Sequence, residues 1–148
     1  MVFTVLITVI SCSTTDDNNV DDSSSGDNST ANQIENTAQT GTWRITYFYD
    51  SDHEETNSFS GYNFTFNSDG SLIAVNGNTT ITGSWSITDS SSSSSDDDHH
   101  FNIFFASPND FEELSDDWEI ISTSDTKIKL TDVSGGNGGI DFLTFEKN

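Results

Sequence analysis

Basic residues are nearly missing from this chain: four lysines and arginines stand against 25 acidic residues, for a formal net charge of −21. Proteins that bind nucleic acids need many cations to neutralise phosphates, so this composition excludes a nucleic-acid partner. Anionic membrane surfaces are disfavoured as electrostatic partners for the same reason. With 148 residues, the chain has room for one domain.

Apolar residues are also scarce, at 31% of the chain, and they are unevenly placed. Residues 1–11 hold eight of them, residues 12–40 only five, and residues 41–148 the remaining 33. Sixteen of those 33 are Phe, Trp or Tyr. We therefore expect a small core made largely of aromatic rings in residues 41–148.

The N-terminal apolar run, Val2 to Ile10, is too short to span a bilayer of roughly 30 Å and is typical of the apolar part of a signal peptide. The residues Val9-Ile10-Ser11-Cys12 resemble a bacterial lipobox. That resemblance implies cleavage of residues 1–11 and attachment of a diacylglycerol to the thiol of Cys12, the sole cysteine. The alternative is a buried N-terminal strand with an inert cysteine. No lysine or arginine precedes Arg44, so we expect the true start codon upstream or a truncated chain.

The segment from residue 12 to residue 40 is predicted to be a disordered tether after the lipidated cysteine. Residues 13–40 are almost all polar, with six acidic residues and no basic one, and they cannot bury enough apolar surface to offset the entropy of ordering. Asp16 and Asp17 resemble the export signals of some Gram-negative surface lipoproteins. The resemblance implies an outer-membrane lipoprotein in the cell envelope that is exposed on the surface.

Residues 41–148 alternate apolar and polar side chains with a period of two, which predicts half-buried strands. Gly70 suits the left-handed position of a hairpin turn. Ser107, as an N-cap followed by Pro108, predicts a helix of one or two turns that ends by Asp116. The predicted strands are Trp43–Asp50, Tyr62–Asn67, Leu72–Asn76, Thr79–Thr88, Phe101–Phe105, Trp118–Thr123, Lys127–Thr131 and Ile140–Phe145. Eight short antiparallel strands indicate an up-and-down barrel or a sandwich.

A family resemblance favours the barrel. Gly41-Thr42-Trp43 looks like the Gly-x-Trp signature of lipocalins, in which the tryptophan closes one end of the barrel. The blocks that follow are similar to the lipocalin-like domains of small bacterial lipoproteins: residues 61–70, residues 83–87, Asp117-Trp118 and residues 143–147. The domain lacks the long C-terminal helix of lipocalins. The basic residue that packs over the signature tryptophan has three candidates, Lys127, Lys129 and Lys147. The predicted fold is therefore all-β, an eight-stranded antiparallel lipocalin-like barrel with one short helix, over residues 41–148.

The barrel interior is predicted to be mostly filled, because large rings in a small barrel leave little free volume. Any shallow pocket lies at one end, where Tyr47, Phe101 and Trp118 are the candidate ligand-binding residues beneath the 108–116 helix as a partial lid. Trp85 is expected to be buried structure. The predicted inward set is Trp43, Ile45, Tyr47, Tyr62, Phe64, Phe66, Leu72, Ile81, Trp85, Ile87, Phe101, Ile103, Phe105, Trp118, Ile120, Ile128 and Leu130.

Catalytic and metal sites have little support in the sequence. His53 to Asn57 departs from the zinc-protease motif, and serines are too abundant for any Ser/His/Asp triad to stand out. His99-His100 follow a run of serines and aspartates, and we favour a solvated loop over a metal site. Residues 67–70 and 135–141 are near misses for calcium loops and are better interpreted as hairpin loops. We expect no enzyme activity, no catalytic or metal residue and no cofactor.

Two functional hypotheses remain. The first is a monomeric, non-enzymatic binding module anchored to the membrane through Cys12, which captures a small apolar or amphipathic ligand at the barrel mouth. The second is a structural or adhesive surface lipoprotein with a filled barrel, which binds a protein or glycan through its loops. A cavity inside the barrel would favour the first hypothesis, and a filled interior would favour the second.

Overall fold

The structure, a computed structural model, describes residues 26–89, 99–133 and 139–148, with the side chains of residues 26–30 left out. The predicted signal peptide, Cys12 and the first part of the predicted tether lie outside the described residues. The strands are β1 (Trp43–Asp50), β2 (His53–Glu54), β3 (Asn63–Phe66), β4 (Ser71–Asn76), β5 (Thr79–Asp89), β6 (His99–Phe104), β7 (Asp116–Ser124), β8 (Lys127–Val133) and β9 (Ile140–Lys147). The helices are α1 (Gly26–Ala38), the 3₁₀ helix η1 (Thr56–Phe59) and α2 (Asn109–Glu112).

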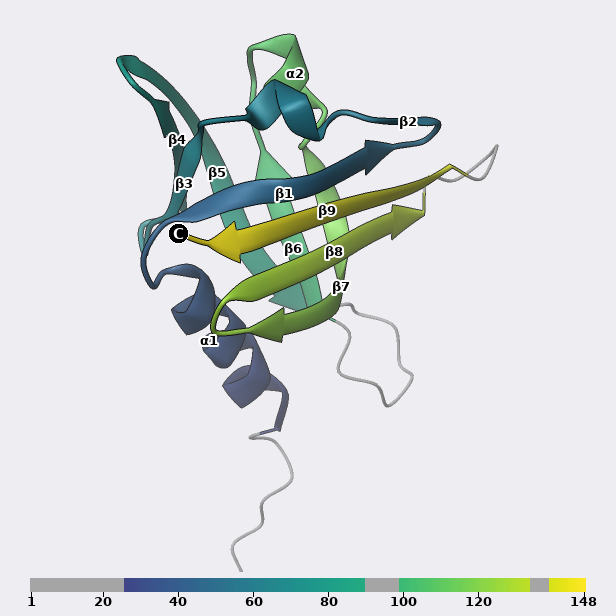
Figure 1. The fold of residues 1–148 in the computed structure, drawn as a ribbon. Helices are drawn as coiled ribbons and strands as arrows, with labels where there is room; N and C mark the ends of the chain where they lie inside the picture. The colour runs from purple at the N-terminus through teal and green to yellow at the C-terminus, as the bar shows by residue number, and fades with distance from the viewer. Residues whose placement is uncertain (1–25, 90–98, 134–138) are drawn as a thin grey trace, which may run out of the picture.

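The strands form an eight-stranded antiparallel closed barrel, as predicted (Figure 1). Each long strand pairs with the next along the chain, β1 and β9 pair along most of their length, and β1 meets β3 at Trp43 and Phe64. The two-residue strand β2 is an addition that the sequence does not predict, and it folds back on the end of β1. Gly70 has the expected left-handed φ of 81° in the turn between β3 and β4.

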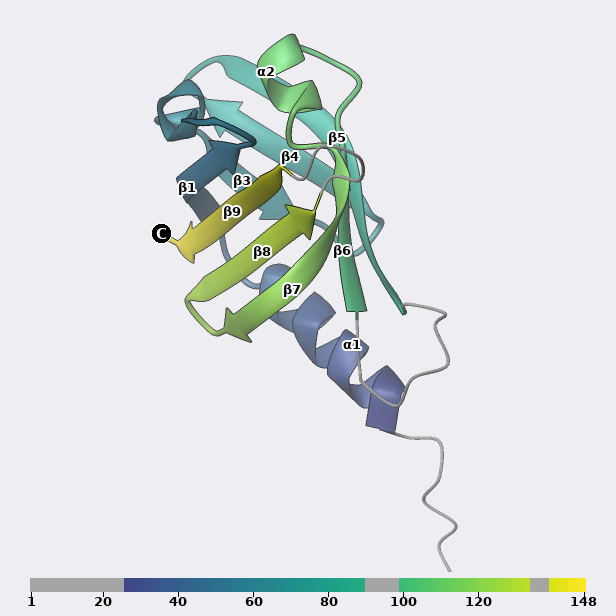
Figure 2. The same ribbon diagram turned by 90° about the vertical axis from the view of Figure 1, so that its right-hand side faces the viewer.

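The α-helices α1 and α2 lie at opposite ends of the barrel (Figures 1 and 2). The predicted short helix is α2, although Pro108 rather than Ser107 is its N-cap residue and no side chain caps it. The tether prediction is wrong for residues 26–38, which form α1. Ala31, Ile34 and Ala38 are spaced three and four residues apart, so they share one helix face. Ile34 and Ala38 are buried in the core, and this tertiary packing offsets the polar composition of the segment.

The interior is aromatic, as expected, and its side chains contact one another across the barrel. Phe66 is in edge contact with three other rings, those of Trp85, Phe101 and Phe145, at centroid distances of 5.2–5.4 Å. Trp85 is buried, as predicted, and its indole N–H donates to the carbonyl of Asn67. Gly83 permits the approach of a neighbouring strand, because a Cβ there would lie 2.3 Å from the carbonyl oxygen of Phe104.

Sixteen of the seventeen predicted inward residues are buried or packed against the core, and Tyr47 is the exception. Tyr47 is 40% exposed, so its assignment to the interior is wrong. The register of β1 against β9 shifts between Ile45 and Tyr47, which turns Phe48 inward and leaves Tyr47 on the outer face. Strict alternation along β1 cannot reveal this irregularity, because Tyr47 and Phe48 are both apolar enough to be buried.

Candidate functional site

The α2 end of the barrel, where the sequence predicts a ligand pocket, is filled by aromatic rings. Phe111 of α2 lies within 6.1 Å, between ring centroids, of four other aromatic rings: Phe59, Tyr62, Phe64 and Phe105. Leu114 behind it is fully buried. The sequence predicts a partial lid here, but Phe111 and Leu114 pack into the core and fill this end of the barrel.

The structure brings together two of the three candidate ligand-binding residues, Phe101 and Trp118, and separates Tyr47 from them. Phe101 and Trp118 face each other across β6 and β7, and both are almost completely buried. The Trp118 indole N–H donates to the carbonyl oxygen of Leu114 at 3.0 Å, so its polar atom already has a partner. Tyr47 lies on the outside, where its ring is nearly parallel to that of Tyr49.

The opposite end is closed by the signature tryptophan. Trp43 is fully buried, and its indole N–H donates to the carbonyl oxygen of Ala38 at 2.8 Å, which fixes the end of α1. Of the three candidate basic residues, Lys147 lies over the ring, with its Nζ 4.9 Å from the ring centroid. This arrangement agrees with the expectation from the lipocalin signature.

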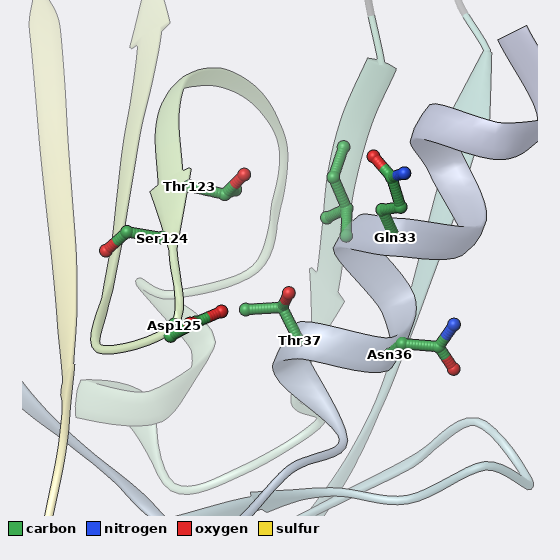
Figure 3. A pocket seen from close by; sticks show the side chains of 7 residues that line it. Gln33, Asn36, Thr37, Thr123, Ser124 and Asp125 are labelled. Atoms are coloured by element: carbon green, nitrogen blue, oxygen red, sulfur yellow. The ribbon is translucent and has the colours of Figure 1, made fainter. Parts of the chain in front are cut away.

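A pocket of about 440 Å³ lies at this end of the barrel, between α1 and the hairpin that joins β7 to β8 (Figure 3). None of the seventeen predicted inward residues lines it. The helix contributes Gln33, Ile34, Asn36 and Thr37 to the lining. The hairpin contributes Thr123, Ser124 and Asp125. In Figure 3 the side chains of Thr37 and Asp125 point toward each other across the gap.

The sequence does not predict this pocket, because the polar composition of residues 26–38 predicts a tether instead of the helix that forms one wall. The spacing of Ala31, Ile34 and Ala38 was the available signal for the helix. Three small or aliphatic residues in a long polar segment give only a narrow apolar stripe along one helix face. The contact of this stripe with the barrel stabilises the helix.

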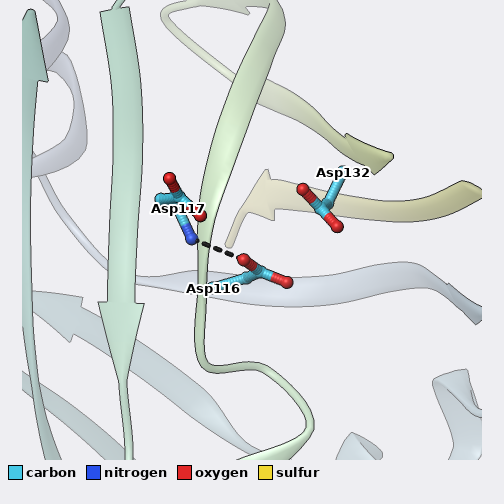
Figure 4. A group of neighbouring side chains, drawn as sticks. All are labelled: Asp116, Asp117 and Asp132. Atoms are coloured by element: carbon cyan, nitrogen blue, oxygen red, sulfur yellow. Dashed lines mark hydrogen bonds between the residues drawn. The ribbon is translucent and has the colours of Figure 1, made fainter. Parts of the chain in front are cut away.

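Three aspartates gather where β7 begins and β8 ends, namely Asp116, Asp117 and Asp132 (Figure 4). One carboxylate oxygen from each lies within 4.8 Å of the others. Burial is the main cause that raises the pKa of Asp116 to about 6, and the neighbouring carboxylates of Asp117 and Asp132 add to it. A proton on Asp116 relieves the repulsion among these groups. Oxygen ligands of this kind suit hard cations such as calcium, which would compete with the proton for Asp116.

A second acidic group lies where α2 approaches β2. A hydrogen bond from Glu113 to Glu55 raises the pKa of Glu113 to about 7, with burial as the second cause, and lowers the pKa of Glu55. The imidazole of His53 contacts the carboxylates of Asp52 and Glu55, and these hydrogen bonds raise its pKa. The cluster is exposed to solvent, and no nucleophile accompanies it among the residues named.

The prediction of a solvated loop at His99 and His100 is wrong. Both belong to β6, because the β5–β6 hairpin continues to the pair Asp89 and His99. His99 is buried, and its Nδ1 lies 2.8 Å from Asp89 Oδ1. His100 points to the other face, which agrees with the argument that adjacent histidines on a strand do not chelate together.

The fold and its closed ends define a lipocalin-like antiparallel barrel. Comparison with solved structures finds similarity to a DUF4847 family protein from Bacteroides vulgatus ATCC 8482, at 20% sequence identity and a TM-score of 0.50. The match covers 78% of this chain and 97% of that protein, and at this identity it supports the fold alone. No protein-family model matches the sequence, and a search of curated proteins finds no match. Among the described residues, no helix is long and apolar enough to cross a membrane.

Proposed function

We propose that this chain is a lipid-anchored, non-enzymatic binding protein of the bacterial cell envelope, whose barrel is a filled scaffold and whose partners bind its outside. The observation that carries this proposal is the packing of the interior. Among the described residues, the twelve largest of the side chains that are less than 2% exposed include Phe66, Phe101 and Trp118. Rings held at this density leave little space for a ligand beside them.

Capture of an apolar ligand at the barrel mouth has less support. The aromatic residues that would line such a mouth are either buried against one another, as Phe101 and Trp118 are, or turned outward, as Tyr47 is. A carrier would have to move Phe111 out of its four ring contacts before a ligand could enter. The second hypothesis from the sequence, a surface protein that binds through its exposed segments, is therefore the one we propose.

The membrane anchor is the part of the proposal that depends on Cys12. The lipobox ahead of this cysteine and the polar residues after it support lipidation. The test is metabolic labelling of a Gram-negative host with an alkynyl fatty acid, followed by detection on the wild-type protein and on Cys12→Ala. We expect label on the wild type only, and protease added to intact cells should remove the wild-type domain if it is displayed outside. Equal labelling of both proteins would refute the anchor, and protection of the domain in intact cells would refute surface display.

A further inference from the structure

We propose that the pocket between α1 and the β7–β8 hairpin binds one unit of an uncharged, hydroxyl-rich ligand, that is, a sugar residue of a glycan. This inference rests on the proposed function, because it names a ligand class for a protein that binds with the outside of its barrel. The pocket volume of about 440 Å³ falls within the range of small-molecule sites, roughly 300–1,000 Å³. A pyranose ring with its hydroxyl groups fits this space.

The lining offers both donors and acceptors, which is what a hydroxyl group requires. Gln33 and Asn36 supply amides, Thr37 and Thr123 supply hydroxyls, and Asp125 supplies a carboxylate that only accepts when ionised. Within the described part of the chain, no side-chain hydrogen bond occupies these five groups. They are consequently open to water or to a ligand.

The charge of the pocket limits the ligand further. Asp125 is the one charged residue in the lining, and it is negative, so a phosphate or carboxylate on the ligand would be repelled. The whole chain carries a net charge of −21, which adds to that repulsion at low ionic strength. An uncharged polyol satisfies all of these conditions.

Both walls of the pocket are fixed before a ligand arrives. The hairpin is closed by hydrogen bonds between Ser124 and Lys127, at 3.1 and 3.3 Å. The helix is held by the buried Ile34 and Ala38 and by the hydrogen bond from Trp43 to Ala38. A site that is already ordered loses less entropy on binding, which favours recognition of a small polar ligand.

The test is a titration of the isotope-labelled full chain with neutral disaccharides of glucose, galactose, mannose and N-acetylglucosamine, followed by NMR. A disaccharide of galacturonic acid is the charged comparison. We expect at least one neutral sugar to shift the amide signals of residues 33–37 and 123–125, and the charged sugar to bind more weakly. Thr123→Val and Asp125→Asn should each weaken binding about tenfold, because the first removes a hydroxyl and the second replaces a charged acceptor with a neutral amide. Thr80→Val, at an exposed threonine of β5, is the matched control and should bind as the wild type does.

Four outcomes would overturn the inference. The first two are the lack of any signal shift in residues 33–37 and 123–125 at about 50 mM sugar, and shifts confined to other parts of the chain. The third is equal or tighter binding of the galacturonic acid disaccharide. The fourth is unchanged sugar affinity in both pocket variants. None of these outcomes depends on the acyl chain at Cys12. Failure of the lipid labelling would therefore leave the sugar site standing, and failure of the sugar titration would leave the anchor standing.

Discussion

At the scale of single residues, the three tryptophans have structural roles. Each indole N–H donates to a backbone carbonyl: Trp43 to Ala38, Trp85 to Asn67 and Trp118 to Leu114. Each ring is also buried against the core. A tryptophan whose ring is packed and whose N–H already has a partner has little left to offer a ligand. The sequence predicts this role for Trp85, whereas Trp118, a candidate ligand-binding residue, also belongs to the core.

The replacement Trp85→Ala tests this assignment. The ring is in contact with those of Phe66 and Phe101, so its removal leaves a cavity in a closely packed interior. We expect a loss of about 3–5 kcal/mol in the free energy of unfolding, measured by denaturant titration. Trp85→Phe keeps a ring and loses the hydrogen bond to Asn67, and it should cost less. A Trp85→Ala protein that is as stable as the wild type would show that the ring is not a core element.

Gly83 is a second residue whose environment predicts a result. Replacement by alanine puts a methyl group against the carbonyl oxygen of Phe104 and the ring of Phe105, both less than 3 Å away. We expect Gly83→Ala to destabilise the fold by about 1–3 kcal/mol, because the strands must move apart. Thermal unfolding of the variant beside the wild type measures this, and an unchanged midpoint would contradict the packing described here.

At the scale of elements, α1 is the part of the fold whose order depends on contact with the barrel. Its sequence is polar, and most of its stability must come from Ile34, Ala38 and the bond to Trp43. We expect limited proteolysis to leave a fragment that keeps α1 and begins before residue 31. Ile34→Asp should release the helix and move the first resistant residue to about Gly41. A wild-type fragment that already begins near Gly41 would contradict the docking of α1.

Two carboxyl groups with raised pKa values, Glu113 beside Glu55 and the partly buried Asp116, should make stability depend on pH. The hydrogen bond to Glu55 raises the pKa of Glu113 to about 7, and burial raises the pKa of Asp116 to about 6. The folded protein therefore holds these two protons more tightly than the unfolded chain does. Their contribution is complete below the ordinary pKa values of 4.5 and 3.8, and it is lost as the pH rises through about 6 to 7. The raised pKa of His53 acts in the same direction.

We therefore expect the unfolding midpoint to fall between pH 5 and pH 8 at constant ionic strength. In Glu113→Gln the side-chain amide can donate a hydrogen bond to Glu55 at every pH. The unfolding midpoint should therefore fall less with pH than it does in the wild type. A midpoint that rises over this range, or a variant with the same slope as the wild type, would contradict the shared proton.

Much of the barrel could be predicted from the sequence, because period-two alternation reports directly which face of a strand is buried. The eight strands, the turn at Gly70 and the buried Trp85 follow from that pattern. The features that were missed depend on tertiary contacts that no local pattern encodes. The register shift after Ile45 places Phe48 in the interior and leaves Tyr47 on the outer face. The β5–β6 hairpin extends to the pair Asp89 and His99, and His99 is buried there. The pocket was missed for the same reason, since it exists only where α1 docks beside the β7–β8 hairpin.

At the scale of the whole molecule, the acidic charge and the filled interior have complementary consequences. A net charge of −21 makes the molecules repel one another, most strongly at low ionic strength. The aromatic interior gives a small domain a large buried area per residue, and under the proposed function any partner binds the outside of the barrel. The central claim is thus that the barrel is a scaffold rather than a carrier.

Titration with a hydrophobic dye, followed by tryptophan fluorescence, tests that claim most directly. Trp118 and Trp85 lie in the interior, so a dye that entered the barrel would quench them. We predict no saturable quenching under native conditions, and quenching only when denaturant opens the core. Saturable quenching of the native protein with one dye per chain would contradict the account, because it would show an interior that accepts an apolar ligand.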